Sequence, residues 1–289
     1  MINKPQEFTS FDVVAVCRRL CCTKKIGHTG TLDPMATGVL VLLTGSSTKA
    51  LSHIPDKSKS YTAEFAVGIE TDTGDIWGEV TSRRDAHVTG NEVSAVLPRF
   101  RGDILQTPPM FSAVRINGKR LYQLAREGKT VERQKRAVHI DRLELAGSDE
   151  AAGRFILKIE CSAGTYIRSV ITDIGEALGC GATMTALCRT AACGFGIADA
   201  LTLDEAKALS EKGELEQRLI PVDRAFAEYG ELVLDGKDSF RFLNGAAIED
   251  KGQRTEPVRV YDGKGLFLGL AKPDGAGFLR HMYLDIRGN

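Results

Sequence analysis

The sequence lacks a long apolar run and a recognisable export signal. No run approaches the roughly 20 apolar residues that span a bilayer. The first ten residues, MINKPQEFTS, have no charged region followed by an apolar core. We therefore expect no membrane-spanning helix and a cytoplasmic protein.

The sequence also lacks the cysteine patterns of disulfide frameworks, zinc sites and redox motifs. Its seven cysteines are an odd number, no two have the C-x-x-C spacing, and Cys21 and Cys22 are adjacent. This pattern predicts reduced cysteines that behave as small apolar side chains.

The chain has no excess of either charge, with 38 Lys or Arg against 38 Asp or Glu. Residues 99–136 depart from this balance, because they hold ten Lys or Arg and only three Asp or Glu, a net charge of +7. A basic cluster of this kind is typical of phosphate binding. On charge alone, a solvated surface arm remains an equal alternative.

Hydrophobic periodicity predicts several strands. Apolar residues alternate with polar ones over 61–69 and over 155–161, so each strand should bury one face. The run VLVLL at 39–43 indicates a third, buried strand. Since strands and helices do not alternate as a βαβ series, we expect an α+β fold with a mixed, largely antiparallel sheet flanked by helices.

Capping signals predict where helices begin. Thr9 and Asp12 resemble a capping box, for a helix that should end in the basic tail Lys24-Lys25. A second helix should have Thr165 as its N-cap. Arg168 then lies in its first turn, where a cation opposes the helix dipole, and such a local conflict often marks a functional residue.

Composition predicts two domains. From about Gly230 the chain changes to short strands separated by glycine turns, which is typical of a small β domain. We therefore divide the chain into 1–229 and 230–289. Within the first part, the stretch 101–136 should be an arm inserted between two strands of the sheet.

The densest functional signal is the segment GHTGTLDPMATG at 27–38. Three glycines and a proline exclude a regular helix or strand, and Pro34 holds Asp33 out of the α region. A metal site with His28 and Asp33 would lack a third ligand, and no G-x-S-x-G motif supports a hydrolase. The residues alone leave open a catalytic loop and a turn in which Asp33 only caps backbone.

The order and spacing of five motifs resemble the bacterial tRNA pseudouridine-55 synthase (TruB) family across essentially the whole chain. After an opening Lys-Pro and Thr-Ser, the similar segments are GHTGTLDPMATG at 27–38, KSY at 59–61 with TDTGD at 71–75, QTPPMFSA at 106–113 with GKRLY at 118–122, GTYIRS at 164–169 and LCRT at 187–190. Two positions depart from the family pattern, which often has Gly in place of Glu7 and Arg in place of Cys188.

The resemblance implies a pseudouridine synthase fold with a C-terminal PUA-like domain that contacts the tRNA acceptor region. It also implies isomerisation of a T-loop uridine without cofactor or metal. Asp33 would be the catalytic carboxylate, Arg168 its guanidinium partner and Tyr61 the stacking platform for a flipped base.

The remaining residues that the resemblance implies would bind RNA. Leu187 would close the base pocket, His28 would fill the space left by flipped nucleotides, and Tyr166 would support the catalytic pair by a hydrogen bond. Lys59 would contact the substrate, and the arm would grip the T-stem through Arg115, Lys119 and Arg120. We expect a monomer acting on tRNA; the alternative is a non-catalytic tRNA-binding or folding chaperone on the same scaffold.

Overall fold

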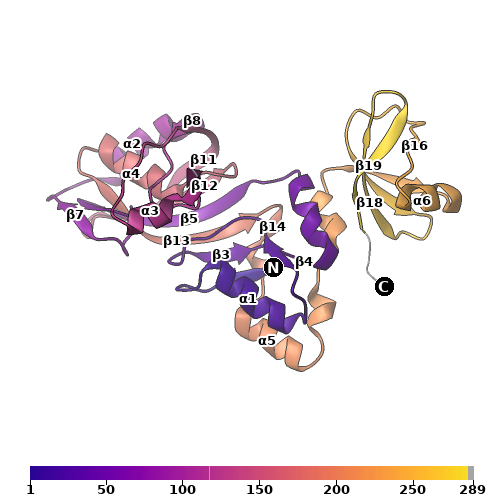
Figure 1. The fold of residues 1–289 in the computed structure, drawn as a ribbon. Coiled ribbons are helices and arrows are strands. Elements are labelled where there is room, and N and C mark those ends of the chain that lie inside the picture. The colour runs from indigo at the N-terminus through magenta and orange to yellow at the C-terminus, as the bar shows by residue number, and fades with distance from the viewer. Residues whose placement is uncertain (117, 286–289) are drawn as a thin grey trace.

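The computed structural model describes residues 1–116 and 118–285, and its centre is an eight-stranded sheet (Figure 1). The strand order is β1-β3-β13-β5-β12-β11-β8, with β14 paired to β13. Its strands are β1 (Ile2–Lys4), β3 (Thr37–Leu40), β5 (Lys59–Val67), β8 (Gly102–Gln106), β11 (Arg136–Asp149), β12 (Arg154–Cys161), β13 (Ala182–Ala192) and β14 (Phe195–Gly196). Within this sheet the β3–β13 pair is parallel and the other pairs are antiparallel. The predicted α+β fold with a largely antiparallel sheet is confirmed.

One face of the sheet is buried under helices. Strands β5 and β12 supply apolar side chains to this face, because buried and more exposed residues alternate along them. Tyr61, Ala63 and Phe65 are buried on β5, and every second residue of β12 is buried beside them. The apolar stripes of α2 (Gly90–Val96) and α4 (Ile167–Ala177) complete this core.

Helix ends follow local capping, with two corrections. Helix α1 (Ser10–Leu20) opens with the expected Thr9–Asp12 capping box, yet it ends at Leu20, before the Lys24-Lys25 tail. Helix α4 does not use Thr165 as its N-cap, since that hydroxyl donates to the Ser162 carbonyl at 3.0 Å and the cap residue is Tyr166. Helix α5 (Leu203–Glu211) opens with a full capping box formed by Thr202 and Glu205.

The arm is shorter than predicted. Residues 102–106 and 136 belong to β8 and β11, which pair with each other, so the inserted segment is 107–135. It contains a small hairpin, β9 (Arg115–Ile116) and β10 (Lys119–Arg120), followed by α3 (Leu121–Arg126).

The strand predicted at 39–43 is divided in two. Strand β3 ends at Leu40, and β4 (Leu42–Thr44) pairs instead with β2 (Ile26–His28) in a separate two-stranded sheet. Another hairpin joins β6 (Ile69–Thr71) to β7 (Val80–Arg83). Short 3-10 segments complete this part of the chain: Gly45–His53, Leu97–Phe100, Ile197–Asp199, Leu215–Arg218 and Val222–Phe226.

A second, five-stranded sheet forms the C-terminal part, drawn in yellow in Figure 1. Its order is β15-β17-β18-β19-β16, and its strands are β15 (Gly230–Leu234), β16 (Ile248–Glu249), β17 (Val258–Asp262), β18 (Phe267–Pro273) and β19 (Phe278–Leu284). The predicted small β region is present, but it also contains the unpredicted helix α6 (Gly236–Leu243). Among the described residues, no helix is long and apolar enough to cross a bilayer.

Candidate active site

A cavity of about 360 Å³ brings together segments that lie far apart in the sequence. The loop 29–33, strand β5, residues 112–113, the start of α4 and strand β13 all line it. Of the predicted site residues, six line this cavity: Asp33, Lys59, Tyr61, Tyr166, Arg168 and Leu187.

An ion pair between Asp33 and Arg168 lies at this cavity. The Arg168 Nε donates to Asp33 Oδ2 at 2.9 Å, and Nη2 donates to Oδ1 at 3.2 Å. The Arg168 side chain is only 5% exposed, whereas that of Asp33 is 35% exposed. The carboxylate is therefore the partner that solvent or a substrate can reach.

The guanidinium of Arg168 is fixed by two further hydrogen-bond acceptors and a second carboxylate. It donates to the Thr73 carbonyl at 2.8 Å and to the Phe111 carbonyl at 2.7 Å. The Asp75 carboxylate, itself 10% exposed, lies 3.7 Å from Nε. A buried arginine with this many partners is held in one orientation, so the fork geometry toward Asp33 is preorganised.

The loop that carries Asp33 is held by two buried cations. Lys4 is fully buried, and its Nζ donates to the Phe8 and Pro34 carbonyls at 2.6 and 3.3 Å; burial lowers the pKa of Lys4 to about 8. Arg189, also fully buried, donates to the Val39 carbonyl at 2.7 Å and to the Gly30 carbonyl at 3.1 Å. Sequence reasoning gave these two residues no role, although both lie within the motifs.

The opening turn shows the structural consequence of Glu7, which replaces the glycine frequent in the family pattern. Glu7 has φ of 70°, in the left-handed region that glycine adopts without strain. Its backbone N–H donates to the Pro34 carbonyl at 2.9 Å, directly after Asp33. A non-glycine residue therefore bears a strained conformation where the N-terminal segment supports the loop that carries Asp33.

The walls of the cavity combine apolar side chains with one buried amine. Tyr61 and Leu187 are each 7% exposed, and burial raises the pKa of Tyr61 to about 12, so its phenol stays neutral at physiological pH. Lys59 is 9% exposed, and burial lowers its pKa. Within residues 1–116 and 118–285, no carboxylate forms an ion pair with Lys59.

The other predicted residues have different environments. Tyr166 lines the cavity, but across the described chain its hydroxyl makes no hydrogen bond to Asp33 or Arg168; instead its backbone N–H and carbonyl pair with the Gln106 side chain at 2.7 and 3.0 Å. The hydrogen bond expected from this phenol to Asp33 or Arg168 is therefore not formed among the described residues, and the observed contacts of Tyr166 with Gln106 are made by its backbone. His28 lies one residue outside the lining segment, and burial lowers its pKa.

The three arm residues do not line the cavity. Arg115, Lys119 and Arg120 are exposed on the β9–β10 hairpin, and Lys119 Nζ lies 3.7 Å from Glu127. Exposed cations on a hairpin beside the cavity are available to a polyanion.

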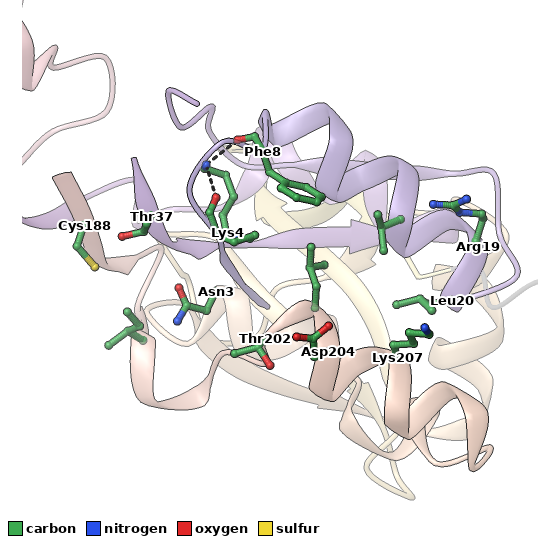
Figure 2. Close-up of a pocket in the computed structure, with 14 residues that line it drawn as sticks. Asn3, Lys4, Phe8, Arg19, Leu20, Thr37, Cys188, Thr202, Asp204 and Lys207 are labelled. Atoms are coloured by element: carbon green, nitrogen blue, oxygen red, sulfur yellow. Dashed lines mark hydrogen bonds between the residues drawn. The ribbon is translucent and has the colours of Figure 1, made fainter. Parts of the chain in front are cut away.

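A larger cavity, of about 970 Å³, lies between β1, α1 and α5 (Figure 2). Lys4, Phe8, Arg19, Leu20 and Lys207 are among its lining residues. Figure 2 shows Lys4 directed at backbone carbonyls, including that of Phe8, so its charge is used in holding the N-terminal turn. None of the described ion-paired residues of the smaller cavity lines this one.

Over the part of the chain that the structure describes, no group of three or more His, Cys, Asp or Glu side chains could hold a metal ion. What the smaller cavity offers chemically is a fixed carboxylate with a guanidinium partner, beside a buried aromatic ring and a buried amine.

Three family models match successive parts of the chain. The TruB family pseudouridylate synthase N-terminal domain matches residues 18–167, the tRNA pseudouridylate synthase B C-terminal domain matches 168–227, and the pseudouridine synthase II TruB C-terminal model matches 230–280. The tRNA pseudouridine synthase B of Pelotomaculum thermopropionicum is 43% identical over 278 residues, covering 95% of this chain and 87% of that protein. The tRNA pseudouridine synthase B of Dehalococcoides mccartyi is 41% identical over 278 residues, covering 96% and 92%.

Solved structures share the fold at lower identity. A chain of an H/ACA ribonucleoprotein bound to a substrate RNA containing 2′-deoxyuridine matches with a TM-score of 0.73 and 21% identity, covering 98% of this chain and 83% of that one. A chain of a Cbf5-Nop10-Gar1 complex matches with a TM-score of 0.71 and 24% identity, covering 94% and 76%. The solved structures show the shared fold, and the family models and the two relatives show that this chain belongs to the TruB family of pseudouridylate synthases.

Proposed function

We propose that this pseudouridine synthase isomerises one T-loop uridine of tRNA, the uridine-55 of the family, and that Asp33 is its catalytic carboxylate. The observation that carries the proposal is the Asp33–Arg168 ion pair at a cavity that Tyr61 and Leu187 also line. A charged, half-accessible carboxylate beside a buried aromatic ring suits a reaction on a flipped nucleotide.

The chemistry is an isomerisation whose atoms balance without a co-reactant. The N1–C1′ bond breaks, the uracil turns, and C5 bonds to C1′; the C5 proton is lost and N1 gains a proton. The carboxylate either adds covalently to the substrate or promotes removal of a sugar proton, and both roles need its ionised form. Neither role requires a metal or an organic cofactor.

Binding of the flipped uridine follows from the cavity walls. The Tyr61 ring would stack on the uracil, an interaction worth roughly 1–3 kcal/mol per base in single-stranded complexes. Leu187 would cover the other side of the base. Lys59, a buried amine that pairs with no carboxylate in the described chain, would face an oxygen or phosphate of the nucleotide. Tyr166 would contact the substrate from the start of α4.

The rest of the tRNA would be held outside the cavity. Arg115, Lys119 and Arg120 would contact T-stem phosphates, and His28 would occupy space vacated by flipped nucleotides. We assign residues 1–229 to catalysis and 230–289 to a PUA-like domain that contacts the acceptor region. The protein would act as a cytoplasmic monomer.

The experiment that tests the proposal maps pseudouridine in tRNA from cells with the gene intact, deleted, or replaced by the Asp33→Asn variant. We expect loss of one T-loop pseudouridine in both altered strains. Retention of this modification in the deletion strain would refute the proposed site. Restoration of tRNA function by Asp33→Asn without pseudouridine would instead indicate the folding-chaperone activity.

A further inference from the structure

Two residues that line the active-site cavity, Thr29 and Ser112, carry buried hydroxyl groups without partners among the described residues. Ser112 is 6% exposed, and its Oγ is buried without a hydrogen-bond partner among residues 1–116 and 118–285. Thr29 lines the same cavity, and its Oγ1 is likewise buried and unpaired within those residues. Buried hydroxyl groups nearly always have a partner, so each exception at a cavity points to a ligand.

The backbone around Ser112 is fixed from two sides. On one side, Arg168 Nη2 donates to the carbonyl of Phe111 at 2.7 Å. On the other, the Tyr122 N–H at the start of α3 donates to the Ser112 carbonyl at 3.1 Å, and the Leu121 N–H donates to the Val114 carbonyl at 2.8 Å. Ser112 therefore lies between the catalytic arginine and the helix of the RNA-binding arm.

With its backbone held in this way, Ser112 can still rotate about its χ1 torsion. Rotation between staggered wells moves Oγ without disturbing the backbone contacts to Arg168 and α3. Stacking on Tyr61 is tolerant of base identity, so it does not determine how the uracil is rotated within its own plane. A hydroxyl donor at the cavity wall, turned toward the base by rotation about χ1, would set that orientation.

Resting on the proposed function, we propose that Ser112 Oγ donates a hydrogen bond to an acceptor oxygen of the flipped uridine, either a uracil carbonyl or the ribose 2′-oxygen. Ser112 is then a substrate-binding residue that orients the nucleotide over Asp33. The same segment connects α3 with Arg168 through the backbone carbonyls of Phe111 and Ser112.

The test compares Ser112→Ala with a matched control, Ser239→Ala. Ser239 is equally buried, at 7% exposed, but its Oγ donates to the Leu234 carbonyl at 3.4 Å in the second sheet's core. For Ser112→Ala we expect kcat/KM on a T-arm hairpin to fall about three- to tenfold, the value of one hydrogen bond, with Tm unchanged or raised. For Ser239→Ala we expect a lower Tm and a wild-type rate at saturating RNA.

The two variants should affect different readouts, since Ser112→Ala lowers kcat/KM and Ser239→Ala lowers Tm. This difference separates a ligand contact from a structural one. Unchanged kcat/KM for Ser112→Ala, or a loss that only accompanies a lower Tm, would overturn the inference while leaving the proposed function intact. Absence of turnover by the wild-type protein would overturn both. Ser112→Cys, a weaker donor of similar size, should fall between wild type and alanine.

A hairpin with 2′-deoxyuridine at the target position identifies the acceptor. If the ratio of wild-type to Ser112→Ala affinity collapses to one, the partner is the ribose 2′-oxygen. If the ratio persists, the partner is a uracil carbonyl. Either result supports the contact, and equal affinities of both proteins for the normal uridine hairpin would refute it.

Discussion

Replacing Asp33 by Asn removes the charge that the proposed chemistry uses while keeping the shape of the side chain. In the structure the carboxylate accepts hydrogen bonds from Arg168 Nε at 2.9 Å and Nη2 at 3.2 Å. An asparagine offers one acceptor oxygen, so one of these two bonds is lost.

The expected loss of stability is small. A hydrogen bond to a charged group contributes about 1.5–3 kcal/mol to the free energy of unfolding. Because the Asp33 side chain is 35% exposed, solvent screens this interaction, and we expect a loss of about 1 kcal/mol. Asp75 remains 3.7 Å from the guanidinium as its counter-ion. A loss of about 1 kcal/mol in the free energy of unfolding corresponds to a decrease in Tm of about 2–4 °C.

The expected loss of turnover is large. Removal of a group that acts in the reaction itself costs at least about 10⁴-fold in comparable enzymes, whereas tRNA affinity should stay within about twofold. The assay follows tritium released from C5 of uridine in a single turnover at saturating tRNA, because formation of the C5–C1′ bond displaces that hydrogen.

The matched control is Asp250→Asn. Asp250 is also paired with an arginine, Arg254, at 2.6 Å, but lies in the C-terminal part with its side chain 3% exposed. We expect this variant to lose more stability than Asp33→Asn and to keep its rate at saturating tRNA. Turnover by Asp33→Asn near the wild-type rate, or a Tm loss beyond about 10 °C, would refute the reasoning.

Three further predictions concern the base pocket, the arm and a buried carboxyl. Tyr61→Phe should bind the T-arm like wild type, whereas Tyr61→Leu should lose roughly 1–3 kcal/mol of stacking; equal, mild effects in a binding titration would assign Tyr61 to the core alone. Reversal of Arg115, Lys119 and Arg120 to Glu should flatten the slope of log affinity against log salt by about 1.5–2.5 without altering saturated turnover, and an unchanged slope would show a merely solvated arm. Burial raises the pKa of Asp173 from 3.8 to about 6, so stability should fall as pH rises between these values, since the folded state binds more protons there. Asp173→Asn should accordingly raise Tm at pH 8 and leave it unchanged at pH 3, measured by thermal denaturation; a lower Tm at pH 8 would contradict this.

Local sequence determined those features that depend on neighbours along the chain. The alternation at 155–161 and over most of 61–69 indicated two strands with one buried face, because side chains of a strand alternate between its faces. The second pattern extended too far, since β5 ends at Val67 and Ile69 belongs to β6. The capping boxes at Thr9 and Thr202 placed the starts of two helices. The family motifs identified Asp33 and Arg168 before any contact between them was visible.

Only the tertiary structure decided features that depend on distant segments. Leu40 and Leu42 belong to different sheets because their backbone partners, β1 and β2, come from elsewhere in the chain, so a continuous apolar run could not reveal the break. Tyr166 displaced Thr165 as the cap of α4 since Gln106, 60 residues earlier, binds its backbone.

The same limit applies to the candidate active site. A cation in the first turn of α4 is unfavourable by itself, and the sequence could not show what compensates it. In the folded chain Arg168 meets Asp33 across 135 residues and also satisfies the carbonyls of Thr73 and Phe111. The sequence therefore indicated which residues the candidate site contains, and tertiary packing fixed their distances, because the ion pair is formed by segments that meet only on folding.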